Sequence, residues 1–137
     1  MNREEIKKLL PHREPMLLLD EVSLQDGVAV GKYRVRGDEF FLQGHFPGNP
    51  VVPGVILCEM MAQTACVLVD ADEAFTPYYT GMNNVKFKRK VLPGDTVELK
   101  SVLTSVKKPF YFMKSEGKVE GVLAVCGELS FAAIAGE

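Results

Sequence analysis

The feature that most constrains the fold is a long apolar segment that follows a loop rich in proline and glycine. From Val55 to Val69 the chain is apolar on nearly every side, and only Glu59, Gln63 and Thr64 interrupt the run. Such a pattern predicts an α-helix that is buried on most of its surface. The rest of the chain must therefore wrap around this helix.

Patterns typical of β-strands occupy most of the remaining chain. Two runs flank Gln25-Asp26-Gly27, which predicts a hairpin, and four more follow the helix with turn sequences between them. No link among the last four is long enough for a crossover helix, so we expect antiparallel strands that are neighbours in sequence or nearly so. The predicted fold class is α+β, with a six-stranded, mostly antiparallel, curved sheet wrapped around a long central helix. The predicted strands are residues 16–24, 28–36, 78–92, 96–106, 110–116 and 122–134.

A short helix is predicted at the start of the chain. Asn2 and Glu5 have the spacing of a capping box, and Pro11 ends the apolar periodicity. His12 lies in the turn that follows. We interpret it as a structural histidine bonded to backbone, because no carboxylate or nucleophile is patterned near it.

Length and composition limit the class of protein. The 137 residues, of which 47% are hydrophobic, fit a single domain spanning 1–137. A net charge of −2 argues against a nucleic-acid binder. The first ten residues lack the apolar core of a signal peptide, and the apolar helix is shorter than the roughly 20 residues that a bilayer requires. We therefore expect a soluble, cytoplasmic protein that does not associate with membranes.

The three cysteines, Cys58, Cys66 and Cys126, are an odd number, and no histidine or cysteine has the spacing of metal ligands. We expect them to be reduced core residues, and we expect no metal site.

The loop ahead of the apolar helix is predicted to be rigid. Three prolines between Pro47 and Pro53 fix φ, and Gly48 permits a turn that is closed to other residues. His45, at the start of this loop, is therefore held still. Taken alone it could be a structural histidine bonded to backbone; together with the acidic residue on the helix it suggests an active site.

That acidic residue is Glu59, which shares a helix face with Gln63 because the two lie four positions apart. A buried carboxylate is costly unless it is paired. It is either a structural carboxylate satisfied by backbone donors or an arginine, or a general acid kept protonated by desolvation. Gly54 and Val55, at the helix start, offer unpaired N–H groups and the positive end of the helix dipole, which suit an oxyanion such as a thioester enolate.

These residues resemble the signature of a known family, the β-hydroxyacyl-acyl-carrier-protein dehydratases of type II fatty-acid synthesis, in the branch with glutamate on the helix. The opening and a later landmark also match, so the resemblance covers nearly the whole chain. Two positions depart from the pattern: Glu14 stands where an aromatic or aliphatic residue is common, and Cys66 where glycine is common. The matching segments are His45-Phe46-Pro47-Gly48-x-Pro50-x-x-Pro53-Gly54-Val55 with Glu59 and Ala62-Gln63, then Leu10-Pro11-His12-Arg13, then Asn84 to Arg89 with Pro93-Gly94-Asp95.

The resemblance implies a hot-dog fold and the reversible dehydration of (3R)-3-hydroxyacyl-[acyl-carrier-protein] to the trans-2-enoyl thioester, without a cofactor. It implies that His45 is the base at C2, that Gly54 N–H polarises the thioester carbonyl, and that Glu59 assists departure of the C3 hydroxyl, directly or through a water oriented with Gln63. It also implies homodimers, assembled as a trimer of dimers, in which His45 of one subunit faces Glu59 of the other.

Two further features have alternative interpretations. Residues 86–108 carry seven basic residues against two acidic ones, and Lys86, Lys88 and Lys90 are predicted to share one face of a strand that also contains Arg89. This is either a solvated strand face or, as the resemblance implies, a docking patch for the acidic acyl carrier protein. Tyr78 is either ordinary sheet packing or the aromatic gate of the acyl tunnel.

Three other activities fit the same motif or fold. A dehydratase that also isomerises trans-2 to cis-3 enoyl chains shares the motif, including the glutamate. A hot-dog acyl-thioester hydrolase, or a catalytically silent acyl-carrier binder, shares the fold. The intact His45 loop disfavours the hydrolase, and the presence of both His45 and Glu59 disfavours the silent binder.

Overall fold

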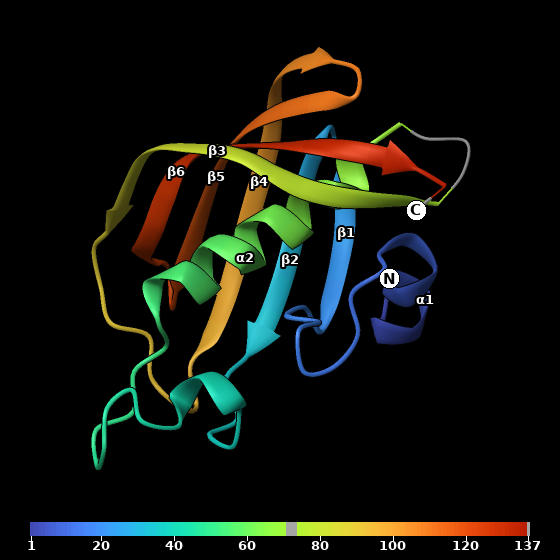
Figure 1. The fold of residues 1–137 in the computed structure, drawn as a ribbon. Helices are drawn as coiled ribbons and strands as arrows, with labels where there is room; N and C mark the ends of the chain where they lie inside the picture. The colour runs from blue at the N-terminus through green and yellow to red at the C-terminus, as the bar shows by residue number, and fades with distance from the viewer. Residues whose placement is uncertain (71–73, 137) are drawn as a thin grey trace.

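The central helix begins where the proline-rich loop ends, and the sheet curves around it (Figure 1). The computed structural model describes residues 1–70 and 74–136. All strand pairings are antiparallel and form a single six-stranded sheet, which confirms the predicted fold class. In chain order the elements are α1 (Arg3–Leu9), β1 (Glu21–Gln25), β2 (Val28–Arg34), the 3-10 turn η1 (Phe40–Leu42), α2 (Gly54–Ala65), the 3-10 turn η2 (Cys66–Leu68), β3 (Phe75–Phe87), β4 (Thr96–Lys107), β5 (Phe110–Val119) and β6 (Val122–Ala135).

Helix α2 is buried as its sequence predicts, although the regular α-helix is shorter than the apolar run. Nine of its residues are buried, and its wide apolar surface packs inside the sheet. The α-helical pattern ends at Ala65, and the chain tightens into η2 before it turns extended at Val69. The helix thus ends before Val69, while Glu59 and Gln63 stay within its regular part.

The predicted N-terminal features are confirmed with one correction. Asn2 and Glu5 form the capping box of α1, and the β1–β2 hairpin turns at Asp26 and Gly27, both with positive φ. Residues 16–20, however, are not part of the first strand. The Leu18 amide and the Met16 carbonyl bond to a helix side chain instead of to a neighbouring strand.

Of the last four strands, which were expected to be neighbours in sequence or nearly so, β4, β5 and β6 follow this order and β3 does not. The order is β1-β2-β4-β5-β6-β3, so β3 pairs with β6 and forms an edge of the sheet, far from β4. The connection from β3 to β4 crosses beneath the N-terminal end of α2 (Figure 1). Strand β3 also ends at Phe87 and not near Leu92, so Lys88, Arg89 and Lys90 belong to this connection.

Two of the three cysteines are core residues, and the third is not. Cys58 and Cys66 are buried, and burial, with the Glu59 charge as a smaller contribution, raises the pKa of both thiols. The helix-end position 66 is therefore filled by a packed thiol. Cys126 is half-buried and lies on the outer face of the sheet. Over the described ranges, no helix has the length and apolar character needed to cross a bilayer.

Candidate active site

The loop between η1 and α2 fixes His45 through both its backbone and its ring. The backbone carbonyl of His45 accepts a hydrogen bond from Val51 N–H at 2.8 Å, and the ring Nδ1 lies 2.8 Å from the Val51 carbonyl oxygen. Because a carbonyl only accepts, Nδ1 must carry the proton. In the neutral ring, Nε2 then has a free lone pair, which is the state required of a general base.

The start of α2 supplies the donors predicted for an oxyanion. Pro53 is the N-cap residue and has no side-chain donor or acceptor with which to cap the helix. Within residues 1–70 and 74–136, neither Gly54 N–H nor Val55 N–H donates a hydrogen bond. A Cβ at position 54 would lie 2.8 Å from two ring carbons of Phe87, so a side chain there would force the Phe87 ring to move.

His45 and the helix start line the same pocket, which has a volume of about 490 Å³. The connection after β3 also lines this pocket, and it brings three basic side chains to it. Lys86 does not line it. Glu59 does not line it either, and no contact joins Glu59 to His45 among the residues that the structure describes. The lining residues are His45, Val51, Val52, Gly54, Leu57, Phe87, Lys88, Arg89, Lys90 and Val91.

Glu59 lies further along α2 and is held by two side chains. Gln63 Nε2 donates to Glu59 Oε2 at 2.8 Å, as the shared helix face predicts. His12 Nε2 is 3.2 Å from the same oxygen, and each of the two side chains is 19% exposed. The interpretation of His12 as a backbone-bonded turn residue is therefore wrong, because the turn after α1 folds over the middle of α2. Local sequence gave no sign of this contact between residues far apart in the chain; the match of His12 to the family's opening was the only signal.

Gln63 is 2% exposed and fully used in hydrogen bonding. Its Oε1 accepts from Leu18 N–H at 2.9 Å, and its Nε2 also donates to the Met16 carbonyl at 2.8 Å. The amide therefore joins Glu59 to the segment that carries His12.

Helix α1 fixes this segment from the other side. Glu14 forms ion pairs with Arg3 at 2.8 Å and Lys7 at 3.1 Å. A backbone hydrogen bond, followed by that of the Lys7 ammonium, lowers the pKa of Glu14 to about 2. The Arg13 guanidinium donates to the carbonyls of Leu10, His12 and Lys7. Glu14, the departure from the family pattern, thus ties the turn to α1.

The two tyrosines at the start of β3 differ in their surroundings. Tyr79 donates its hydroxyl to the Cys58 carbonyl at 2.6 Å, and burial, with Glu59 as a smaller contribution, raises the pKa of that hydroxyl. Tyr78, the predicted gate, is 48% exposed, and neither it nor Tyr79 lines the His45 pocket. The gating role of Tyr78 stays a prediction.

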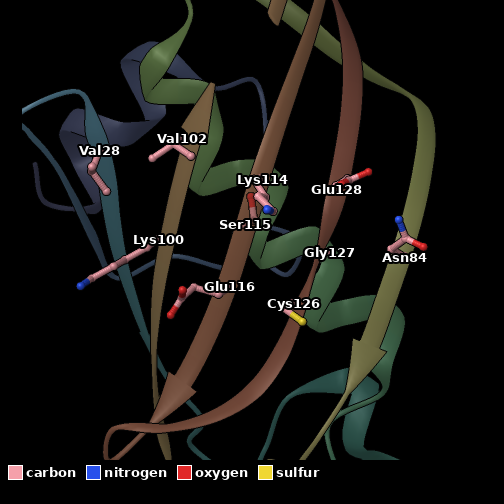
Figure 2. A pocket seen from close by; sticks show the side chains of 10 residues that line it. All are labelled: Val28, Asn84, Lys100, Val102, Lys114, Ser115, Glu116, Cys126, Gly127 and Glu128. Atoms are coloured by element: carbon pink, nitrogen blue, oxygen red, sulfur yellow. The ribbon is translucent and has the colours of Figure 1, made fainter. Parts of the chain in front are cut away.

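A second hollow, of about 410 Å³, lies on the opposite side of the sheet (Figure 2). Lys100, Glu116 and Cys126 occupy paired positions on three adjacent strands, and Figure 2 shows them on the face away from α2. This hollow has charged residues of both signs and no contact with His45 or Glu59. We therefore place the candidate active site on α2.

Comparison with known proteins decides the family. The ApeI-like family model, described as ApeI dehydratase, matches residues 21–124. The 3-hydroxyacyl-[acyl-carrier-protein] dehydratase FabZ of Clostridium perfringens (strain SM101 / Type A) is 40% identical over 136 residues, which cover 96% of this chain and 98% of the relative. The FabZ of Latilactobacillus sakei subsp. sakei (strain 23K) is 42% identical over 136 residues, with 96% and 97% covered. This chain belongs to the FabZ-type dehydratases.

Solved structures agree on the fold of this FabZ-type chain. The dehydratase heterocomplex ApeI:P from Xenorhabdus doucetiae matches with a TM-score of 0.82 at 24% identity, over 96% of this chain and 91% of that one. A hypothetical thioesterase with coenzyme A from Streptococcus pneumoniae TIGR4 matches with a TM-score of 0.64 at 12% identity, over 84% and 85%. The hot-dog fold is thus confirmed, and at 24% identity or less these two structures show the fold alone.

Proposed function

We propose that this protein removes water reversibly from (3R)-3-hydroxyacyl-[acyl-carrier-protein] in fatty-acid synthesis, with His45 as the base. One observation carries the assignment of the base. His45 Nδ1 bonds to the Val51 carbonyl, so the proton-accepting lone pair of the neutral ring is on Nε2, and this ring lines the pocket at the start of α2. The FabZ relatives, 40% to 42% identical over nearly the whole chain, carry the assignment of the reaction.

Each step of the elimination has a group to perform it. His45 Nε2 takes the proton from C2, and the electrons of that C–H bond form the C2=C3 double bond as the C3–O bond breaks. The thioester oxygen, which gains negative charge, accepts hydrogen bonds from the free N–H groups of Gly54 and Val55. The leaving hydroxyl takes up the proton that His45 removed from C2 and departs as water, while Glu59 orients this hydroxyl, directly or through a water. The reaction is redox neutral, so its balance requires no cofactor.

The basic residues beside the pocket suit a substrate carried on an acidic protein. Lys88, Arg89 and Lys90 line the same pocket as His45, so a carrier docked on them has its acyl thioester at the entrance. Lys86 lies outside the pocket, on β3, and its part in docking rests on the sequence pattern alone.

A complete site requires a second copy of the chain. Glu59 does not line the His45 pocket, so one chain does not bring the predicted acid and base together. Edge strand β3 exposes Tyr78, Met82 and Phe87, which are 48%, 52% and 53% exposed, and Val55 in the first turn of α2 is 70% exposed. We infer that two copies join along β3, so that His45 of one subunit faces Glu59 of the other. Assembly of such dimers into a trimer of dimers stays a prediction.

The test of the reaction is direct. The protein is incubated with 3-hydroxyacyl carrier substrates of several chain lengths, and the products are identified by mass and chromatography. We expect the trans-2-enoyl product without release of the carrier thiol. Thiol release would instead indicate a hydrolase, a cis-3 product would indicate an isomerase as well, and unchanged substrate would contradict the proposal.

A further inference from the structure

We propose that His12 is a positioning residue for Glu59: it fixes one carboxylate oxygen so that the other faces the substrate. This inference rests on the proposed function. It concerns a residue that makes no contact with the reacting atoms, and it assigns a task to the turn after α1.

The two oxygens of the Glu59 carboxylate have different surroundings. Oε2 receives the Gln63 amide at 2.8 Å and lies 3.2 Å from His12 Nε2. Oε1 receives no hydrogen bond from any residue in the described part of the chain, and it is not an enclosed atom. With Oε2 held at two points, the orientation of the carboxylate plane is fixed, and Oε1 is the oxygen available to a hydroxyl group or to a water.

The other ring nitrogen of His12 determines which atom carries the proton. His12 Nδ1 is fully buried. Among the buried side-chain nitrogen and oxygen atoms of the described ranges, it alone has no hydrogen-bond partner. If Glu59 were protonated and donated to Nε2, the ring proton would have to lie on Nδ1, as an unpaired buried donor. A doubly protonated ring would bury the same unpaired donor. The neutral ring with its proton on Nε2 leaves only a lone pair at Nδ1, so the geometry favours Nε2–H donating to an ionised Glu59.

The turn is anchored well enough for His12 to act as a fixed support. Gln63 binds the backbone of residues 16 and 18, and Glu14 binds Arg3 and Lys7 of α1. Arg13 donates to the carbonyl of His12 itself. The backbone on both sides of His12 is therefore anchored, so the turn cannot move away from Glu59 without breaking these contacts.

Three variants test the proposal. His12→Gln places an amide nitrogen near the position of Nε2 and keeps the donor, whereas His12→Leu removes the donor. Lys8→Leu is the matched control, because Lys8 is an exposed residue of the neighbouring helix. Since a hydrogen bond to a charged group is lost, we expect His12→Leu to lower kcat by roughly 10- to 100-fold with KM for the carrier-bound substrate within about threefold. His12→Gln should keep kcat within about threefold, and Lys8→Leu should match the unmodified protein.

Two results would overturn the proposal. The first is a His12→Leu variant that keeps kcat within about threefold of the unmodified protein. The second is a His12→Gln variant whose kcat is as low as that of His12→Leu although both variants are folded. That result would mean that the His12 ring matters only for packing. Nitrogen NMR of the His12 ring provides a readout that does not require activity. We expect a protonated Nε2 that shifts in Glu59→Gln and a bare Nδ1, and a proton on Nδ1 would contradict the proposal. If the unmodified protein forms no enoyl product, the proposed function fails, whereas the NMR result still tests the contact.

Discussion

Replacement of Gln63 by methionine should destabilise the fold, because the amide accepts from a buried backbone N–H and donates to a part-buried backbone carbonyl. Methionine has nearly the same length and shape, so little cavity is created. The change leaves the Leu18 N–H, which is buried, without an acceptor and the Met16 carbonyl without its donor. One buried unpaired donor costs about 1–3 kcal/mol, and the remaining lost hydrogen bonds bring the total to about 2–4 kcal/mol.

For a chain of this size the loss corresponds to a fall in Tm of roughly 6–20 °C. Thermal unfolding followed by circular dichroism measures it, at one protein concentration so that any self-association is held constant. Gln43→Met is the matched control, because Gln43 is exposed and the same chemical change there should alter stability by less than about 0.5 kcal/mol. A Tm for Gln63→Met within about 2 °C of this control would refute the argument that the amide holds the turn against α2.

Three further predictions concern the site and its supports. His45→Ala chains mixed with Glu59→Ala chains, after dissociation and reassociation, should recover about one quarter of the unmodified activity, because random pairing makes half of the dimers mixed and half of their sites whole; no recovery despite subunit exchange confirmed by mass would contradict the shared site. Charge reversal at Lys88 and Lys90 should raise KM for carrier-bound substrates much more than for a short thioester without the carrier, and equal effects on both would exclude a docking role. The pKa of Glu14 is lowered from 4.5 to about 2, so its backbone hydrogen bond and its ion pairs stabilise the fold above pH 4.5, and this stabilisation is lost as the pH falls through about 2. The difference in Tm between the unmodified protein and Glu14→Gln should shrink over that range, and a constant difference would show that the charge is not the cause.

The features predicted correctly are those that depend on neighbouring residues. The capping box at Asn2 and Glu5, the turn at Asp26 and Gly27, and the start of α2 after Pro53 are each determined within a few positions. The face shared by Glu59 and Gln63 follows from helical periodicity alone, and the bond between them is present. The sequence therefore predicted the local structure at the start of α2 and along the face that carries Glu59 and Gln63.

The features that were missed depend on contacts between distant segments. Strand β3 pairs with β6 and not with β4. No local pattern distinguishes these two pairings, because β4 and β6 both have the alternating apolar and polar residues of a strand. The contact between His12 and Glu59 depends on the path of the turn after α1, which Arg3 and Glu14 direct through ion pairs. The first strand was predicted too long for the same reason, a contact between distant segments. The residues from Met16 onward have the composition of a strand, but the Met16 carbonyl bonds to the Gln63 side chain.

The order of strands in the sheet also constrains the order in which the chain can fold during synthesis. Strand β3 leaves the ribosome soon after α2, but the strand with which it pairs, β6, begins at Val122. At about 5–20 residues per second the wait lasts a few seconds, during which β3 has no strand to pair with and α2 is only partly covered. A chain that stops before Val122 loses the pairing of two strands, because β3 has nothing to join. The apolar helix that defines the fold is thus made before most of the sheet that protects it, and its covering is completed only when β6 and β3 pair.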